Sequence, residues 1–224
     1  MQIPLTSQEF FDIFRQYNQG VWPAQWVAIS LCVLAAMFAF FGWGLHTKVA
    51  LSLMSVMSTL IGISYFWIYY VPHNSAGWIF GGLFVLQGLL LAGYAFRGKG
   101  EDWFGPGIWP WVGAILVAYA IVGYPVVGLI AGHSYPALPI LGIAPCPSMI
   151  FMIGMLLAIQ PKISKWLLVI PIVWSALATM AALQLGVVED FGLTVAGVAA
   201  LAFSISEAKE PAPVRKHAPR LRPH

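Results

Sequence analysis

Residues 76–96 read AGWIFGGLFVLQGLLLAGYAF and contain no charged side chain. A helix rises about 1.5 Å per residue, so this run is long enough to cross the roughly 30 Å hydrocarbon core of a membrane. The rest of the chain is similar in character, because 60% of its 224 residues are hydrophobic and only 8% are charged. Soluble domains carry about 25% charged residues. The composition therefore excludes an ordinary water-soluble protein.

Six further apolar runs accompany this segment, and together they predict an all-α polytopic transmembrane bundle of seven spans within one domain, residues 21–206. The fifth run is too short to cross alone, because its helix would be only about 20 Å long. The seven expected spans cover residues 24–45, 49–71, 76–96, 109–131, 148–160, 166–185 and 191–206.

The two ends of the chain differ from the spans. Residues 1–20 predict an amphipathic helix in the membrane interface, because Phe10, Phe14 and Tyr17 recur at helical spacing opposite charged side chains. The stretch from Thr6 to Glu9 has the spacing of a capping box at the start of this helix. Residues 207–224 are basic and rich in proline, which predicts a disordered cytoplasmic tail.

Lysine and arginine are distributed unequally between the two sides of the predicted bundle. With seven spans, one side receives only Arg15 and the other receives all the remaining lysines and arginines. The positive-inside rule then places the N-terminus outside and the C-terminus in the cytoplasm of a cell inner (plasma) membrane. We expect the lipid bilayer to be the main partner, and we expect no nucleic acid.

The third span carries a stripe of small residues that lets another helix approach closely. The stripe consists of Gly77, Gly81, Gly88 and Ala92. One interpretation is packing within the bundle. The alternative is a contact with a second copy or with a larger membrane complex.

Residues 132–147 read GHSYPALPILGIAPCP and are the most informative segment for function. Four prolines prevent a continuous helix, yet the segment is too apolar for a solvated loop. Non-helical backbone persists at membrane depth only where protein buries it or a wet cavity lines it. We therefore predict a re-entrant segment above the short fifth span. Cys146 then lies near a helix N-terminus, which favours a thiolate, although an inert buried thiol is the alternative.

The outer side also gathers polar residues that orientation does not explain, and these predict a recessed pocket. The candidates for lining it are His133, Tyr135, Cys146, Ser148, His73, Glu189, Asp190, Asn18 and Gln25. Glu189 and Asp190 are either helix N-terminal acids favoured by the helix dipole or a cation or proton site at the pocket rim.

Two histidines and a cysteine on one face would suit copper or zinc, with His73, His133 and Cys146 as ligands. Haem ligation by the histidines is a further alternative. A third interpretation is that both histidines only cap helix ends by hydrogen bonds.

Several segments resemble an uncharacterised bacterial family of multi-pass inner-membrane proteins. The resemblance is carried by YNQGVWPAQ at residues 17–25, GHSYP at 132–136, PCPS at 145–148 and EDFG at 189–192. It covers nearly the whole chain except the basic tail. The resemblance implies a helical inner-membrane protein and implies no activity.

These observations leave three function classes. We expect a ligand-binding or accessory subunit that acts through the outer pocket, because no nucleotide-binding, zinc-protease or serine-hydrolase motif is present. The first alternative is a small-solute or ion permease, against which the scarcity of charges within the spans argues. The second is a membrane-embedded metal or redox protein that uses Cys146, His133 and His73.

Overall fold

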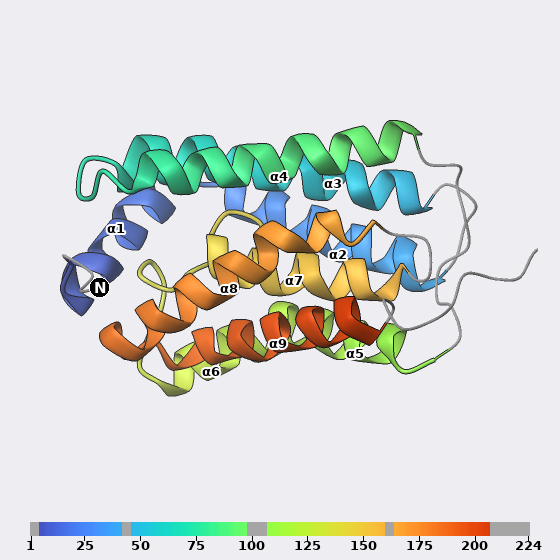
Figure 1. Cartoon of the computed structure of the whole chain (residues 1–224). Coiled ribbons are helices and arrows are strands. Elements are labelled where there is room, and N and C mark those ends of the chain that lie inside the picture. The colour runs from blue at the N-terminus through green and yellow to red at the C-terminus, as the bar shows by residue number, and fades with distance from the viewer. Residues whose placement is uncertain (1–4, 42–45, 98–106, 160–163, 207–224) are drawn as a thin grey trace, which may run out of the picture.

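The structure, a computed structural model, describes residues 5–41, 46–97, 107–159 and 164–206 (Figure 1). All regular secondary structure in these ranges is helical, which confirms the prediction of an all-α protein. The tail predicted for residues 207–224 lies outside the described residues. The elements are α1 (Ser7–Gly20), α2 (Ala24–Phe41), α3 (His46–Leu60), η1 (Ile61–Tyr70), α4 (Gly77–Arg97), α5 (Trp109–Ala118), η2 (Tyr119–Gly123), α6 (Tyr124–Ile130), α7 (Pro145–Ala158), α8 (Trp166–Leu185), η3 (Val188–Asp190) and α9 (Phe191–Ser206).

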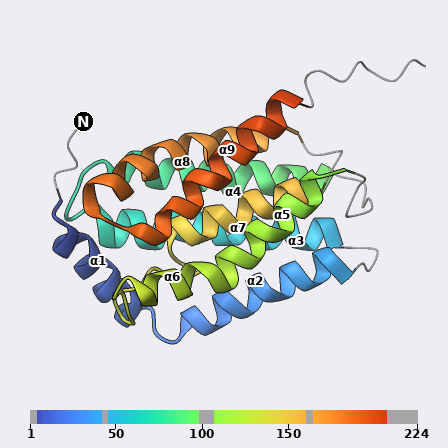
Figure 2. The same cartoon turned by 90° about the horizontal axis from the view of Figure 1, so that it is seen from below.

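Helices α2 to α9 run along a common axis, and α1 lies across one end of them (Figures 1 and 2). The bend between α1 and α2 is 93°. We call this end of the bundle the α1 end. If the bundle axis crosses a membrane, α1 lies parallel to the membrane surface, as its amphipathic sequence predicts.

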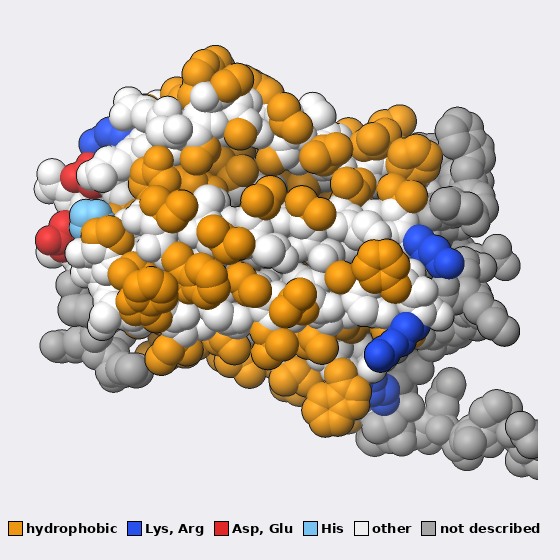
Figure 3. Space-filling view, turned by 90° about the horizontal axis from the view of Figure 1, so that it is seen from above, with side chains coloured by type: hydrophobic (Ala, Val, Ile, Leu, Met, Phe, Trp, Pro, Cys, Tyr) orange, Lys and Arg blue, Asp and Glu red, His pale blue; other side chains and the backbone are white. Residues whose placement is uncertain are grey.

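Five helical runs have the length and apolar composition needed to cross a membrane, and α1 with α2 adds a sixth if the bent pair counts as one span. The 14-residue α7 is shorter, as the sequence predicts. The five runs are Thr47–Tyr70, Gly77–Arg97, Trp109–Ile130, Trp166–Leu185 and Val188–Ser206. Figure 3 shows hydrophobic side chains covering the middle of one face, with charged side chains at its two ends.

Helix α7 forms the centre of the bundle, because every one of its residues is buried. It approaches α5 very closely where glycine faces glycine. A Cβ atom on Gly154 would lie 2.7 Å from the carbonyl oxygen of Gly113, and a Cβ on Gly113 would lie 2.4 Å from the carbonyl oxygen of Gly154. The backbones of the two helices are therefore in direct contact.

The proline-rich segment before α7 is non-helical and descends into the bundle. Residues 141–144 are all buried, so protein covers this irregular backbone. Gly142 has a φ of +90°, and a Cβ there would meet Ala28 of α2 at 2.8 Å. Ser148 fixes the segment, since its Oγ accepts a hydrogen bond of 2.9 Å from the Gly142 amide.

Helix α1 begins with the capping box that the sequence predicts. Thr6 accepts from the Glu9 amide, and the Glu9 carboxylate accepts from the Thr6 amide. These hydrogen bonds hold the pKa of Glu9 below its usual value. On the inner face of α1, Tyr17 shares a 2.8 Å hydrogen bond with Ser64. Burial raises the pKa of Tyr17 to about 12, so its hydroxyl stays protonated.

The small-residue stripe of α4 packs inside the chain. A Cβ on Gly81 would lie 2.8 Å from the carbonyl oxygen of Gly62, and a Cβ on Gly88 would lie 2.8 Å from that of Ser55. Gly77 is buried against Tyr70 in the same way. The stripe thus serves the contact of α4 with α3 and η1.

Candidate functional site

A cavity of about 440 Å³ lies at the α1 end of the bundle, and we call it the aromatic cavity. It lies between α1, η1, α4, α8 and the start of α7. This volume is typical of sites for small molecules. Seven aromatic side chains line the cavity: Phe10, Phe14, Tyr65, Phe66, Tyr70, Phe80 and Trp174.

The π-helical segment η1 supplies three of the aromatic residues that line this cavity. Such segments are frequent at functional sites because the extra residue per turn redirects side chains. Tyr65, Phe66 and Tyr70 all come from η1. Phe66 lies edge-on to Trp174, with ring centroids 5.3 Å apart.

One end of the aromatic cavity is polar. Asp190 and Cys146 line it there. Tyr124 donates a 2.6 Å hydrogen bond to Asp190 Oδ1, and the Cys146 thiol also hydrogen-bonds Asp190. Burial opposes a negative charge on sulfur, so we interpret Cys146 as a thiol and not as the thiolate that its helix position favours. Trp174 is 7% exposed, and its Nε1 has no protein partner among the described residues.

A second hollow, the α1 crevice, lies between α1 and the proline-rich segment. It has a volume of about 340 Å³, and its lining includes His133, Tyr135, Asp12 and Arg15. The crevice is more polar than the aromatic cavity, since charged side chains of α1 face it. It gives His133 access to solvent while the ring of Phe11 packs on the imidazole at 4.2 Å.

Glu189 contacts a residue that lines the α1 crevice, and it directly precedes Asp190, which lines the aromatic cavity. His133 Nδ1 lies 2.8 Å from Glu189 Oε1, although these residues are far apart in the sequence. Glu189 is fully buried, and its Oε2 has no partner within the described residues. Tyr119 donates a 2.9 Å hydrogen bond to the Glu189 carbonyl. Glu189 and Asp190 are both buried directly before α9, and their role as helix N-terminal acids or as a cation or proton site stays a prediction.

The chain matches one known protein family. A family model described as a family of unknown function, DUF6064, matches residues 7–212. The chain belongs to the DUF6064 family. No curated protein and no solved structure gives a match. The resemblance to a family of unknown function is thus confirmed, and the bacterial origin that it implies stays a prediction.

Three of the candidate residues have structural roles in this DUF6064 chain. Asn18 Nδ2 donates to the carbonyl oxygens of Pro136 at 2.7 Å and Leu138 at 2.9 Å. Gln25 donates to the Asn18 carbonyl oxygen. Asn18 thus holds α1 against the proline-rich segment, and Gln25 holds the start of α2 against α1. Ser148 holds the proline-rich segment through its hydrogen bond with the Gly142 amide.

The three proposed metal ligands have different neighbours. His73 is exposed in the turn between η1 and α4, His133 pairs with Glu189, and Cys146 hydrogen-bonds Asp190. Within the described ranges, no three His, Cys, Asp or Glu side chains gather in a geometry that could hold a metal ion.

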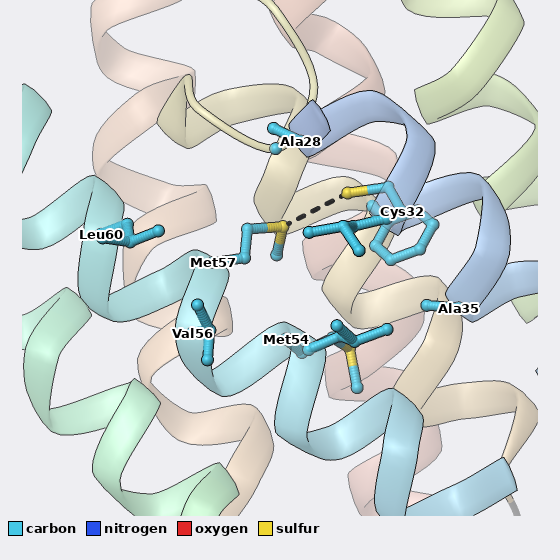
Figure 4. A pocket seen from close by; sticks show the side chains of 11 residues that line it. Ala28, Cys32, Ala35, Met54, Val56, Met57 and Leu60 are labelled. Atoms are coloured by element: carbon cyan, nitrogen blue, oxygen red, sulfur yellow. Dashed lines mark hydrogen bonds between the residues drawn. The ribbon is translucent and has the colours of Figure 1, made fainter. Parts of the chain in front are cut away.

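Cys32 lies away from these hollows, between α2 and α3. Its Sγ donates to the Met57 sulfur at 3.7 Å, beside a cavity of about 60 Å³ that apolar side chains line (Figure 4). Cys32 is buried, and burial of this kind is common for a packed cysteine.

The aromatic part of the site was not predicted from the sequence. Tyr65, Tyr124 and Trp174 lie within apolar runs, where an aromatic residue resembles ordinary core. One signal was available, because a buried tyrosine hydroxyl needs a hydrogen-bond partner. Tyrosines inside a span therefore indicate polar groups on a neighbouring helix, and Asp190 is such a group.

Proposed function

We propose that the protein is a multi-pass membrane protein that binds a lipophilic cation in the aromatic cavity. The observation that supports this proposal is the pairing of many aromatic faces with one carboxyl group. Aromatic faces attract cations, and cages of them recognise quaternary ammonium groups. Asp190 supplies the negative charge, and the described residues that line the cavity include no lysine or arginine.

The edge of the aromatic cavity supports entry from the lipid. Ile79 of α4 and Met180 of α8 line the cavity and are 69% and 52% exposed. Both lie on helices with the length and composition of membrane spans. A ligand that dissolves in the bilayer would reach the cavity between α4 and α8.

The proposal includes an orientation with the α1 end outside an inner membrane and with seven helical passages. In support, Arg15 lies at the α1 end, while Lys48, Arg97 and Lys165 lie at the opposite helix ends. We propose that α7, shielded by its neighbours, is the short fifth passage.

Cysteine labelling tests this orientation, because both native cysteines are buried. In intact cells, a membrane-impermeant maleimide is expected to label Gln16→Cys, which lies on the exposed face of α1. It is expected to label Arg97→Cys only after the cells are permeabilised. Labelling of both variants in intact cells would contradict an odd number of membrane passages between Gln16 and Arg97.

Ligand binding is tested with two probes of equal size and opposite charge. Tetraphenylphosphonium is expected to bind the purified protein in nanodiscs, whereas tetraphenylborate is not, because Asp190 selects for positive charge. Asp190→Asn is expected to weaken tetraphenylphosphonium binding at least about tenfold, which corresponds to about 1.4 kcal/mol. Isothermal titration calorimetry measures both affinities.

A matched pair of variants checks the location of the site. Ala181 lines the aromatic cavity, and Ala176 lies exposed on the same helix. Ala181→Phe is expected to abolish tetraphenylphosphonium binding, and Ala176→Phe is expected to preserve it. Equal binding by the two variants, or equal binding of both probes, would overturn the proposal.

A further inference from the structure

Three ionisable residues, His133, Glu189 and Asp190, lie in succession between the α1 crevice and the aromatic cavity. His133 is partly exposed in the crevice, with 19% of its side chain accessible. Its Nδ1 contacts the buried Glu189, and Asp190 follows Glu189 in the single turn η3. Asp190 lines the cavity at the other end of this series.

The charges in this series do not balance if both carboxyls are ionised. Glu189 has an imidazole partner, and a protonated His133 would neutralise it. Among the described residues, the hydrogen-bond donors to Asp190 are the neutral groups of Tyr124 and Cys146. A buried carboxylate without a cation is costly, so the empty cavity favours a protonated Asp190.

Every titratable group that acts on Asp190 within the described residues fits this account, since none is a lysine or an arginine. The groups are Glu189 on the same turn, Tyr119 and Tyr124 from η2 and α6, Cys146 from α7, Tyr65 from η1 and His133 from the proline-rich segment. A bound cation would be the missing counter-charge.

We infer that binding of the cation releases one proton from Asp190 and that Glu189 and His133 carry this proton to the α1 crevice. This inference rests on the proposed function and adds proton exchange to it. The Asp190 O–H bond breaks, and the carboxylate that remains pairs with the cation. The free Oε2 of Glu189 receives the proton. His133, which is protonated while it pairs with the ionised Glu189, then gives the proton of its other ring nitrogen to crevice water and is left neutral.

The equilibrium part of the inference is tested by tetraphenylphosphonium binding at several pH values in nanodiscs. Release of one proton requires the dissociation constant to fall about tenfold for each unit of pH increase while Asp190 is protonated. In Asp190→Asn this pH dependence is expected to disappear. An affinity that does not change with pH in the wild-type protein would overturn the inference.

The path is tested by the rate of proton release, followed with a pH indicator in a stopped-flow mixer. Replacing a positioned proton-transfer group costs about 100-fold in rate. His133→Gln and Glu189→Gln are therefore expected to slow proton release by about that factor. The tetraphenylphosphonium affinity of His133→Gln should remain within about threefold of wild type, about 0.7 kcal/mol. His73→Gln is the control, because His73 is an exposed histidine outside the crevice.

The outcomes separate the inference from the proposed function. Wild-type rates of proton release in folded His133→Gln overturn the path and leave cation binding intact. Binding without any proton release overturns the exchange and also leaves binding intact. If tetraphenylphosphonium does not bind the wild-type protein, both the function and the inference fall. Slow release in His133→Gln with fast release in His73→Gln supports the path.

Discussion

Asn18→Asp is expected to detach α1 and the proline-rich segment from each other. The Asn18 amide donates to two carbonyl oxygens, and it is completely buried. A carboxylate in its place has no proton to donate and would face those two oxygens as a third acceptor. We expect the free energy of unfolding to fall by about 3 kcal/mol, since each buried group left unpaired costs about 1–3 kcal/mol. Thermal unfolding and hydrogen exchange of α1 measure the change.

Gln19→Glu is the control for this prediction, because it makes the same amide-to-acid change on the exposed face of α1. It should leave the stability nearly unchanged. The effect of Asn18→Asp should also shrink as the pH falls toward about 4, because burial raises the pKa of this carboxyl above its ordinary value and the protonated aspartate regains one donor. Equal stability of the two variants at neutral pH would show that the Asn18 hydrogen bonds are unimportant.

Local signals in the sequence were sufficient to predict where the helices lie. Each expected span overlaps a helix or a continuous helical run, and the short fifth run became the 14-residue α7. The capping box at Thr6 and Glu9 formed because it involves neighbouring residues only. The prolines before Cys146 kept residues 139–144 out of a helix, as proline chemistry requires.

Contacts between distant segments could not be predicted in the same way. In a membrane protein, lipid-facing and interior helix faces are both apolar, so periodicity does not say which face is inside. The sequence therefore could not pair Tyr124 with Asp190 or Asn18 with Leu138. The π-helical turns of η1 have no sequence pattern of their own, so the sequence could not predict that Tyr65, Phe66 and Tyr70 line one cavity. The buried positions of Glu189 and Asp190 depend on contacts of the same kind, with His133 and Tyr124, and so could not be predicted either.

Gly154→Ala is expected to destabilise the centre of the bundle. The new Cβ would lie 2.7 Å from the carbonyl oxygen of Gly113 and 3.0 Å from the Val117 amide nitrogen. Backbone atoms cannot move aside as a flexible side chain can, so α5 and α7 must separate. Overpacking of this kind costs about 1–3 kcal/mol. Thermal unfolding of the purified protein is expected to show a lower midpoint temperature for this variant.

The matched control is Gly93→Ala, because no atom of the described residues lies within 4 Å of a Cβ at that position in α4. Alanine is the better helix former by up to about 1 kcal/mol, so this variant should be as stable as wild type or more so. Gly113→Ala should resemble Gly154→Ala, and the double variant should cost less than the sum, because both methyl groups separate the same two helices. Additive effects, or equal stability of Gly154→Ala and Gly93→Ala, would show that the contact between α5 and α7 is looser than the structure has it.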